Sequence, residues 1–166
     1  MCIRDRLLTD TKDKILTITL NRPEKLNALT PTLLAELKAE LGAAAVNEAV
    51  SDVILKSEGR AFCVGYDLNE ENWITSQYPA NHPGGVEIEQ DKKDIMALLD
   101  YWLDMWRFPK PIIVQVQGAC LSGAGELLAV SDLVVASEQA TFGHPAARDL
   151  GIPPVSYTHL TLPTKA

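Results

Sequence analysis

Apolar segments with the two-residue period of a strand alternate along this chain with segments that have the period of a helix. Residues 15–20 alternate apolar side chains with threonine, which is typical of a strand with one buried face. Further strands are expected at 53–56, 112–116 and 133–136. Helices are expected to begin at Thr30–Pro31 and to cover Ile88–Trp106. Strands that alternate with helices predict an α/β fold.

Both predicted helices carry an apolar face. Thr30 is expected to be the N-cap of the first, with Pro31 at its first helical position. The residues expected on the buried side of this helix are Leu33, Leu34, Leu37 and Leu41. In the second helix the aromatic side chains of Trp102 and Trp106 are expected to pack in the core rather than to bind a cofactor.

Two glycine-bearing turns follow predicted strands. The strand expected at 59–68 runs into the turn Gly65–Asp67, and the turn Ser122–Gly125 opens a helix expected from about Glu126. Glycine lets a ligand approach the backbone, and a helix N-terminus presents free N–H groups. Two amides that converge on one point would form an oxyanion hole, and the nearby Glu126 carboxylate could move a proton. Each turn taken alone is better explained as a simple connection between elements.

Length and composition limit the alternatives. The chain has 166 residues, enough for one domain with one core, and its 46% hydrophobic and 22% charged residues exclude disorder, collagen-like repeats and coiled coil. The net charge of −7 argues against a nucleic-acid partner. Local cations or a helix N-terminus can still hold a small anionic ligand.

The cysteines and the apolar runs bear on the cellular compartment. Cys2, Cys63 and Cys120 are odd in number and lack metal-ligand spacing, so we expect buried or half-buried thiols, no disulfide and no metal site. No stretch reaches the ~20 apolar residues of a membrane span, and the first residues lack the apolar core of a signal peptide. These features predict a soluble, cytoplasmic protein that does not bind membranes.

The two ends of the chain have neither the strand pattern nor the helix pattern of the interior. Residues 1–6 and 155–166 are similar to peptides translated from sequencing-adapter DNA, and we expect them to be non-native scars. The native core is therefore expected to cover residues 7–154.

Six segments in order resemble the crotonase superfamily, also called the enoyl-CoA hydratase/isomerase family. They cover nearly all of 7–154, and their joint order is far more specific than any one of them. The matching segments are 18–29 (ITLNRPEKLNAL), 61–68 (AFCVGYDL), 109–111 (PKP), 117–127 (QGACLSGAGEL), 131–133 (SDL) and 140–145 (ATFGHP).

The resemblance implies a crotonase-like spiral of ββα units, incomplete at its C-terminus, that binds an acyl-CoA thioester. It implies no cofactor beyond coenzyme A as part of the substrate, and a homotrimer or hexamer at full length. The backbone N–H groups of Tyr66 and Gly123 would form the oxyanion hole. The residues implied in CoA and substrate binding are Lys25, Ala28, Leu29, Ala61, Val64, Gly65, Asp67 and Leu68. Either Lys25 or Arg22 could meet a CoA phosphate.

The catalytic carboxylates of the family are matched only in part. Glu126 falls on the first, but the position of the second, after the Phe-Gly-x-Pro segment, holds Ala146. Asp149 could replace the missing acid, although a structural or surface role fits it better. The resemblance therefore implies an acyl-CoA enzyme of fatty acid metabolism, with hydration (a lyase reaction) or isomerisation of an enoyl-CoA as the expected activity.

Two other functions stay open. A serine-type hydrolase would use Ser122 with His144, although Cys120 replaces the first glycine of the Gly-x-Ser-x-Gly elbow. A non-catalytic acyl-CoA binder is suggested by Ala146. A dinucleotide site at Gly123-x-Gly125 is disfavoured because Leu128 stands at the third glycine position. The resemblance also predicts that residues 71–87 cover the acyl group, and that apolar surface is exposed where the family's closing helices would pack.

Overall fold

The structure is a computed structural model that describes residues 6–67 and 88–145. The predictions for Leu68, for the loop 71–87, for Ala146 and Asp149, and for residues 1–5 and 155–166 lie outside the described residues.

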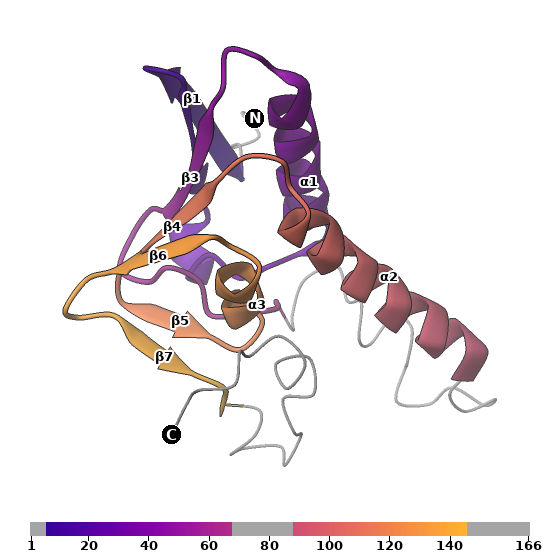
Figure 1. The fold of residues 1–166 in the computed structure, drawn as a ribbon. Helices are drawn as coiled ribbons and strands as arrows, with labels where there is room; N and C mark the ends of the chain where they lie inside the picture. The colour runs from indigo at the N-terminus through magenta and orange to yellow at the C-terminus, as the bar shows by residue number, and fades with distance from the viewer. Residues whose placement is uncertain (1–5, 68–87, 146–166) are drawn as a thin grey trace, which may run out of the picture.

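A five-stranded sheet organises the fold (Figure 1), in the order β1-β2-β3-β4-β6. Its parallel strands are β2 (Ile15–Leu20), β3 (Asp52–Ser57), β4 (Ile112–Val116) and β6 (Leu133–Ala136). The four strands expected from periodicity are thereby confirmed. The sheet sets Ile18 beside Leu55 and Leu55 beside Val114, so that the buried face is continuous from strand to strand.

Strand β1 (Leu7–Lys12) was not expected from its sequence. It pairs antiparallel with β2 through a two-residue turn, Asp13–Lys14, in which both residues have positive φ. Such a turn matches the twist of a hairpin but usually carries Asn-Gly or Asp-Gly. Only Leu7 of this edge strand is buried. The strand therefore lacks both the apolar alternation and the turn signature that would have predicted it.

Helix α1 (Pro31–Val46) begins where the sequence predicted. The hydroxyl of Thr30 accepts a hydrogen bond from the Leu33 N–H at 3.2 Å, and Pro31 occupies the first turn. At the other end, Nζ of Lys110 donates to the carbonyls of Ala44 and Asn47 at 2.6 and 2.7 Å. This cation satisfies backbone acceptors that the helix leaves open.

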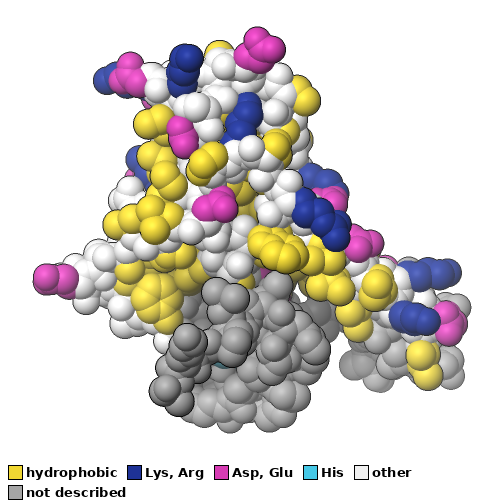
Figure 2. Space-filling view, in the orientation of Figure 1, with side chains coloured by type: hydrophobic (Ala, Val, Ile, Leu, Met, Phe, Trp, Pro, Cys, Tyr) yellow, Lys and Arg dark blue, Asp and Glu magenta, His cyan; other side chains and the backbone are white. Residues whose placement is uncertain are grey.

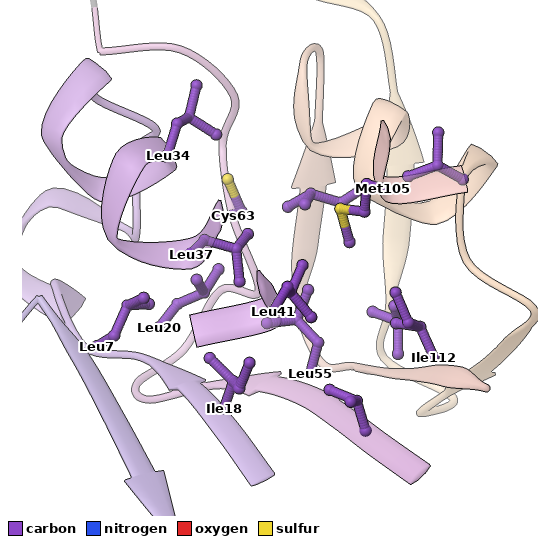
Figure 3. Close-up of a cluster of buried hydrophobic side chains, with 14 of the residues drawn as sticks. Leu7, Ile18, Leu20, Leu34, Leu37, Leu41, Leu55, Cys63, Met105 and Ile112 are labelled. Atoms are coloured by element: carbon purple, nitrogen blue, oxygen red, sulfur yellow. The ribbon is translucent and has the colours of Figure 1, made fainter. Parts of the chain in front are cut away.

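The core lies between the sheet and α1, and Figure 3 shows leucines of the helix facing side chains of the strands. Ile18, Leu37 and Leu55 are at most 1% exposed. The four leucines predicted for the buried side of α1 are all buried.

Helix α2 (Ile88–Trp106) meets this core near its C-terminal end. Trp102 is 3% exposed and Met105 is 5% exposed, whereas Trp106 is 62% exposed and Ile88 is 75% exposed. Figure 1 shows the N-terminal turns of α2 extending away from the sheet and α1. The prediction that both tryptophans pack in the core is therefore correct for Trp102 and wrong for Trp106, whose side chain is exposed.

The strand that was expected to run from residue 59 into the turn Gly65–Asp67 is absent from the structure. Residues 61–67 form only two isolated bridges, Cys63 with Cys120 and Leu29 with Tyr66. The Cys63 N–H donates to the Ala119 carbonyl, whereas the Val64 N–H turns to the Leu26 carbonyl. The segment thus hydrogen-bonds to two different partners in turn, which prevents a regular ladder.

The second glycine turn joins β5 (Ala119–Leu121) to α3 (Ala124–Ala129), and β5 pairs in parallel with β7 (Thr141–Gly143). Neither short strand was expected from the sequence. Helix α3 begins two residues before its predicted start, so that Glu126 lies in its first turn.

Apolar side chains are exposed along β6 and β7, and the packing of the family's closing helices on such a surface stays a prediction. Leu133, Val135 and Phe142 are each more than half exposed, and Figure 2 shows hydrophobic side chains on the surface of the strands. Within residues 6–67 and 88–145, no helix is both long and apolar enough to cross a membrane.

Burial of two cysteines predicts their reactivity. Removal from water raises the pKa of Cys63 and of Cys120 to about 12. At about pH 8 only about one molecule in 10⁴ would carry either thiolate. We expect both to resist iodoacetamide in the folded protein and to react in denaturant, as measured by peptide mass spectrometry. Alkylation of Cys63 in the folded protein at the denatured rate would contradict its burial.

Candidate active site

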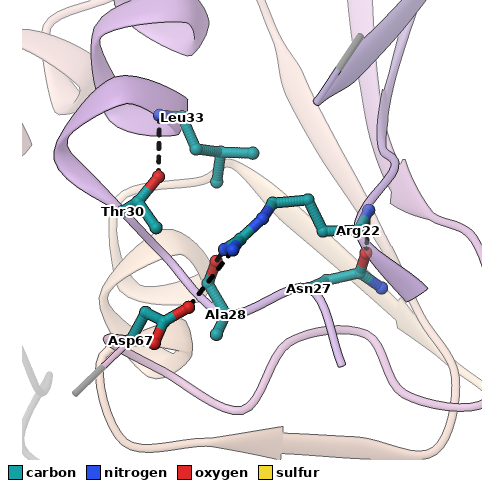
Figure 4. A network of polar contacts seen from close by, with 6 residues as sticks. All are labelled: Arg22, Asn27, Ala28, Thr30, Leu33 and Asp67. Atoms are coloured by element: carbon teal, nitrogen blue, oxygen red, sulfur yellow. Dashed lines mark hydrogen bonds and ion pairs between the residues drawn. The ribbon is translucent and has the colours of Figure 1, made fainter. Parts of the chain in front are cut away.

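A buried ion pair ties the loop after β2 to the first glycine turn (Figure 4). Nη2 of Arg22 lies 3.2 Å from Oδ2 of Asp67, and both side chains are 6% exposed. Nη1 of Arg22 donates to the Ala28 carbonyl at 2.6 Å. The guanidinium, considered above for a CoA phosphate, is thus held inside the protein by a carboxylate and a carbonyl. Its observed partners give it a structural role.

Asn27 completes this polar network. Its Oδ1 accepts from the Arg22 N–H at 2.8 Å, and its Nδ2 donates to the carbonyls of Glu58 and Ala61. Asn27 is fully buried and has a φ of 55°. Asparagine tolerates this left-handed conformation better than most residues. One side chain therefore holds the 22–29 loop against the segment that leads to the glycine turn.

Gly65 lies directly against the second glycine turn. Its φ is +95°, and a Cβ added to it would lie 2.9 Å from the Leu121 carbonyl oxygen and 3.1 Å from the Gly123 nitrogen. Only glycine fits both this conformation and this approach. The two turns, which are 58 residues apart, are therefore in contact through their backbones.

The ring of Tyr66 covers Gly123. A Cβ at position 123 would come within 2.4 to 2.8 Å of three atoms of that ring. The absence of a side chain at Gly123 thus lets Tyr66 pack onto the start of α3. The two residues predicted as oxyanion donors are brought together in this way.

Glu126 is the buried carboxylate at this junction. It is 5% exposed, and its Oε2 accepts a hydrogen bond from the Tyr66 hydroxyl. The indole Nε1 of Trp102 in turn donates to the Tyr66 hydroxyl at 3.3 Å. A carboxylate beside two backbone turns can exchange a proton with a group bound there.

The other predicted binding residues surround these turns. Lys25 is exposed and Val64 is partly exposed, whereas Ala28, Leu29 and Ala61 are buried. The Leu29 N–H donates to the Gly65 carbonyl and the Asp67 N–H donates to the Leu29 carbonyl, both at 2.8 Å. The structure thus assembles the described members of the predicted set around one location, and their contacts with a ligand stay predictions.

Sequence reasoning missed the contacts made by Asn27 and Trp102. Asn27 stood within a recognised motif without a role, and Trp102 was assigned to the core alone. No local pattern indicates a hydrogen bond to a residue 36 positions away, such as that from Trp102 to Tyr66. Within the described ranges, no group of three or more His, Cys, Asp and Glu side chains is placed to hold a metal ion.

Comparisons with known proteins match this arrangement. The sequence model described as enoyl-CoA hydratase/isomerase matches residues 10–166. The chain belongs to the enoyl-CoA hydratase/isomerase family. The resemblance stated from the motifs is therefore confirmed.

Relatives in this family extend well beyond the matched region. The 2,3-dehydroadipyl-CoA hydratase of Escherichia coli is 35% identical over 153 residues, which are 89% of this chain and 52% of that protein. The peroxisomal Delta(3,5)-Delta(2,4)-dienoyl-CoA isomerase of Arabidopsis thaliana is 31% identical over 80% of this chain and 48% of its own length. The chain spans about half the length of the curated relatives it matches.

A solved structure confirms the crotonase-like fold. The crystal structure of an enoyl-CoA hydratase from Shewanella pealeana superimposes with a TM-score of 0.78 at 30% identity. The match covers 93% of this chain and 55% of the other. The α/β architecture predicted from the sequence is therefore that of an incomplete member of this fold.

Removal of one partner of the Arg22–Asp67 pair tests its importance. We expect Asp67→Ala to lower the free energy of unfolding by about 3–5 kcal/mol, because the Arg22 charge stays buried without its carboxylate. Chemical denaturation measures the change.

The pair between Lys38 and Asp104 provides the matched control. Its atoms are 2.9 Å apart, but the two side chains are 57% and 56% exposed. Asp104→Ala should therefore cost less than about 1 kcal/mol. Equal decreases in the free energy of unfolding of Asp67→Ala and Asp104→Ala would contradict a larger structural contribution from the buried pair.

Proposed function

We propose that this protein binds an acyl-CoA thioester and hydrates or isomerises an enoyl-CoA. The observation that carries the proposal is the position of Glu126, a buried carboxylate that contacts the Tyr66 turn three residues after Gly123. Family membership supports CoA-thioester chemistry of this kind. The named relatives include both a hydratase and an isomerase.

The backbone N–H groups of Tyr66 and Gly123 would receive the thioester oxygen. Hydrogen bonds from both would polarise the thioester carbonyl. They would also stabilise the negative charge on its oxygen in the enolate that forms during the reaction. Such donors act strongly where water is excluded, and loss of one typically costs about 10²–10³ in rate. The close approach of Gly65 to Gly123 supports this role, because it brings the two amide-bearing turns together.

Glu126 would act as the acid and base. In hydration, water would add its hydroxyl to the β-carbon while Glu126 accepts the remaining proton, and Glu126 would then return that proton to the α-carbon of the enolate. In isomerisation, Glu126 would take a proton from one carbon of the acyl chain and return it to another. Both reactions pass through an enolate that the same oxyanion hole stabilises.

Conversion of this carboxylate to its amide tests the catalytic role. Glu126→Gln keeps an oxygen that can accept from Tyr66 but cannot accept the proton. We expect kcat on a panel of enoyl-CoA thioesters to fall at least about 100-fold. Affinity for the thioesters, measured by calorimetry, should stay within about threefold of the parent because the donors for the carbonyl are unchanged.

Three results would count against the proposal. If Glu126→Gln turned over the thioesters as fast as the parent, Glu126 would not be the acid/base. Binding without turnover by the parent would favour a non-catalytic acyl-CoA binder. Absence of any binding by the parent would contradict the acyl-CoA assignment itself.

Ser122 distinguishes this chemistry from that of a serine-type hydrolase. We expect Ser122→Ala to retain turnover of enoyl-CoA, because the proposed mechanism uses no nucleophilic hydroxyl. A serine-reactive phosphonate should leave the parent protein unlabelled, as measured by intact mass. Labelling at Ser122 together with loss of activity in the variant would favour the hydrolase.

A further inference from the structure

The side chain of Tyr66 joins three separate parts of the fold. It extends from the first glycine turn, packs its ring on Gly123, and places its hydroxyl between Trp102 of α2 and Glu126 of α3. The oxyanion role proposed above uses only the backbone N–H of this residue. The phenol of Tyr66 is therefore a polar group at the site to which the proposed reaction assigns no role.

The direction of the hydrogen bonds follows from the groups involved. An indole N–H can only donate, so Trp102 occupies a lone pair of the Tyr66 oxygen at 3.3 Å. The phenol proton is then directed to the Glu126 carboxylate, which accepts it at Oε2. A bond received by the phenol also strengthens the bond that it donates.

Packing also restrains the phenol. Gly123 leaves space for the ring, since any Cβ there would overlap three of its atoms. Trp102 is 3% exposed and meets Tyr101 edge-on, with ring centroids 4.8 Å apart. The indole of Trp102, which donates to the Tyr66 hydroxyl, is thus held within the core.

We propose that Tyr66 is a positioning residue that orients the Glu126 carboxylate through its phenol, with Trp102 as the supporting donor. This inference rests on the proposed function, because it assigns a use to the same acid/base. One residue then supplies a backbone N–H for the thioester oxygen and a side-chain O–H for the carboxylate. The side chain of Tyr66 thereby connects one proposed oxyanion donor, its own backbone N–H, to the acid/base.

Loss of the phenol should affect the reaction more than binding. Small displacements of a catalytic group can reduce the rate by orders of magnitude, whereas binding of the thioester would use donors that Tyr66→Phe retains. We expect Tyr66→Phe to lower kcat at least about tenfold, the value of a hydrogen bond to a charged group. KM should stay within about threefold of the parent.

Tyr101→Phe is the matched control. Tyr101 also donates its phenol proton within the core, to the Leu34 carbonyl at 3.1 Å, but its contacts do not include Glu126. Its loss should leave kcat within about twofold of the parent. Equal reductions of kcat in Tyr66→Phe and Tyr101→Phe would show a general packing effect and would overturn the proposal.

A double-mutant cycle tests the supporting donor. Trp102→Phe should lower kcat on its own, and Tyr66→Phe combined with Trp102→Phe should be no slower than Tyr66→Phe alone, because both act through one hydrogen bond to Glu126. Multiplicative losses in the double variant would contradict the connection through Tyr66.

A spectroscopic measurement separates this inference from the proposed function. The indole N–H resonance of Trp102 should shift in Tyr66→Phe, whose ring cannot accept that hydrogen bond, and stay in place in Tyr101→Phe. An unshifted resonance would overturn the contact itself. An unchanged kcat in an active Tyr66→Phe would overturn the positioning role alone, and an inactive parent would overturn the proposed function together with this use of Tyr66.

Discussion

The ion pair between Arg22 and Asp67 is the interaction on which the site depends. Asp67 ends the first glycine turn, and Arg22 follows β2, which the sheet places by its pairing with β3. Two charges that are 6% exposed require each other, because either one alone would be buried without compensation. The pair therefore fixes the Gly65–Asp67 turn to the end of the parallel sheet without any regular strand pairing.

Glycine then allows a second turn to reach the first. The backbone of residues 121–123 packs against Gly65 at a distance that no side chain would permit. In the same way, the ring of Tyr66 packs against Gly123. Glu126 follows Gly123 within the first turn of α3 and meets the Tyr66 hydroxyl. The sheet, the ion pair and two glycines thus bring two glycine turns and one carboxylate together, and the proposed reaction would use the backbone amides of these turns and this carboxylate.

Periodicity predicted the parts of this fold that are buried on one face. The alternation at 15–20 and the cap at Thr30 specify their elements locally, and both were located correctly. Strand β1 was not predicted because five of its six residues are exposed. The strand expected before the turn Gly65–Asp67 does not form because the backbone hydrogen bonds of this segment alternate between two distant segments. The members of the site were identified by motif, but their mutual contacts were not, since Arg22 and Asp67 or Tyr66 and Glu126 meet only after the chain has folded.

The central claim is that the two glycine turns place two N–H donors on one thioester oxygen. Infrared difference spectroscopy of a bound enoyl-CoA, with a ¹³C label at the thioester carbonyl, measures this directly because hydrogen bonds weaken the C=O bond. The account predicts that the band moves to lower wavenumber on binding, and that Gly65→Ala, which separates the turns, reduces the shift. A band at its solution position with the site saturated would contradict the account.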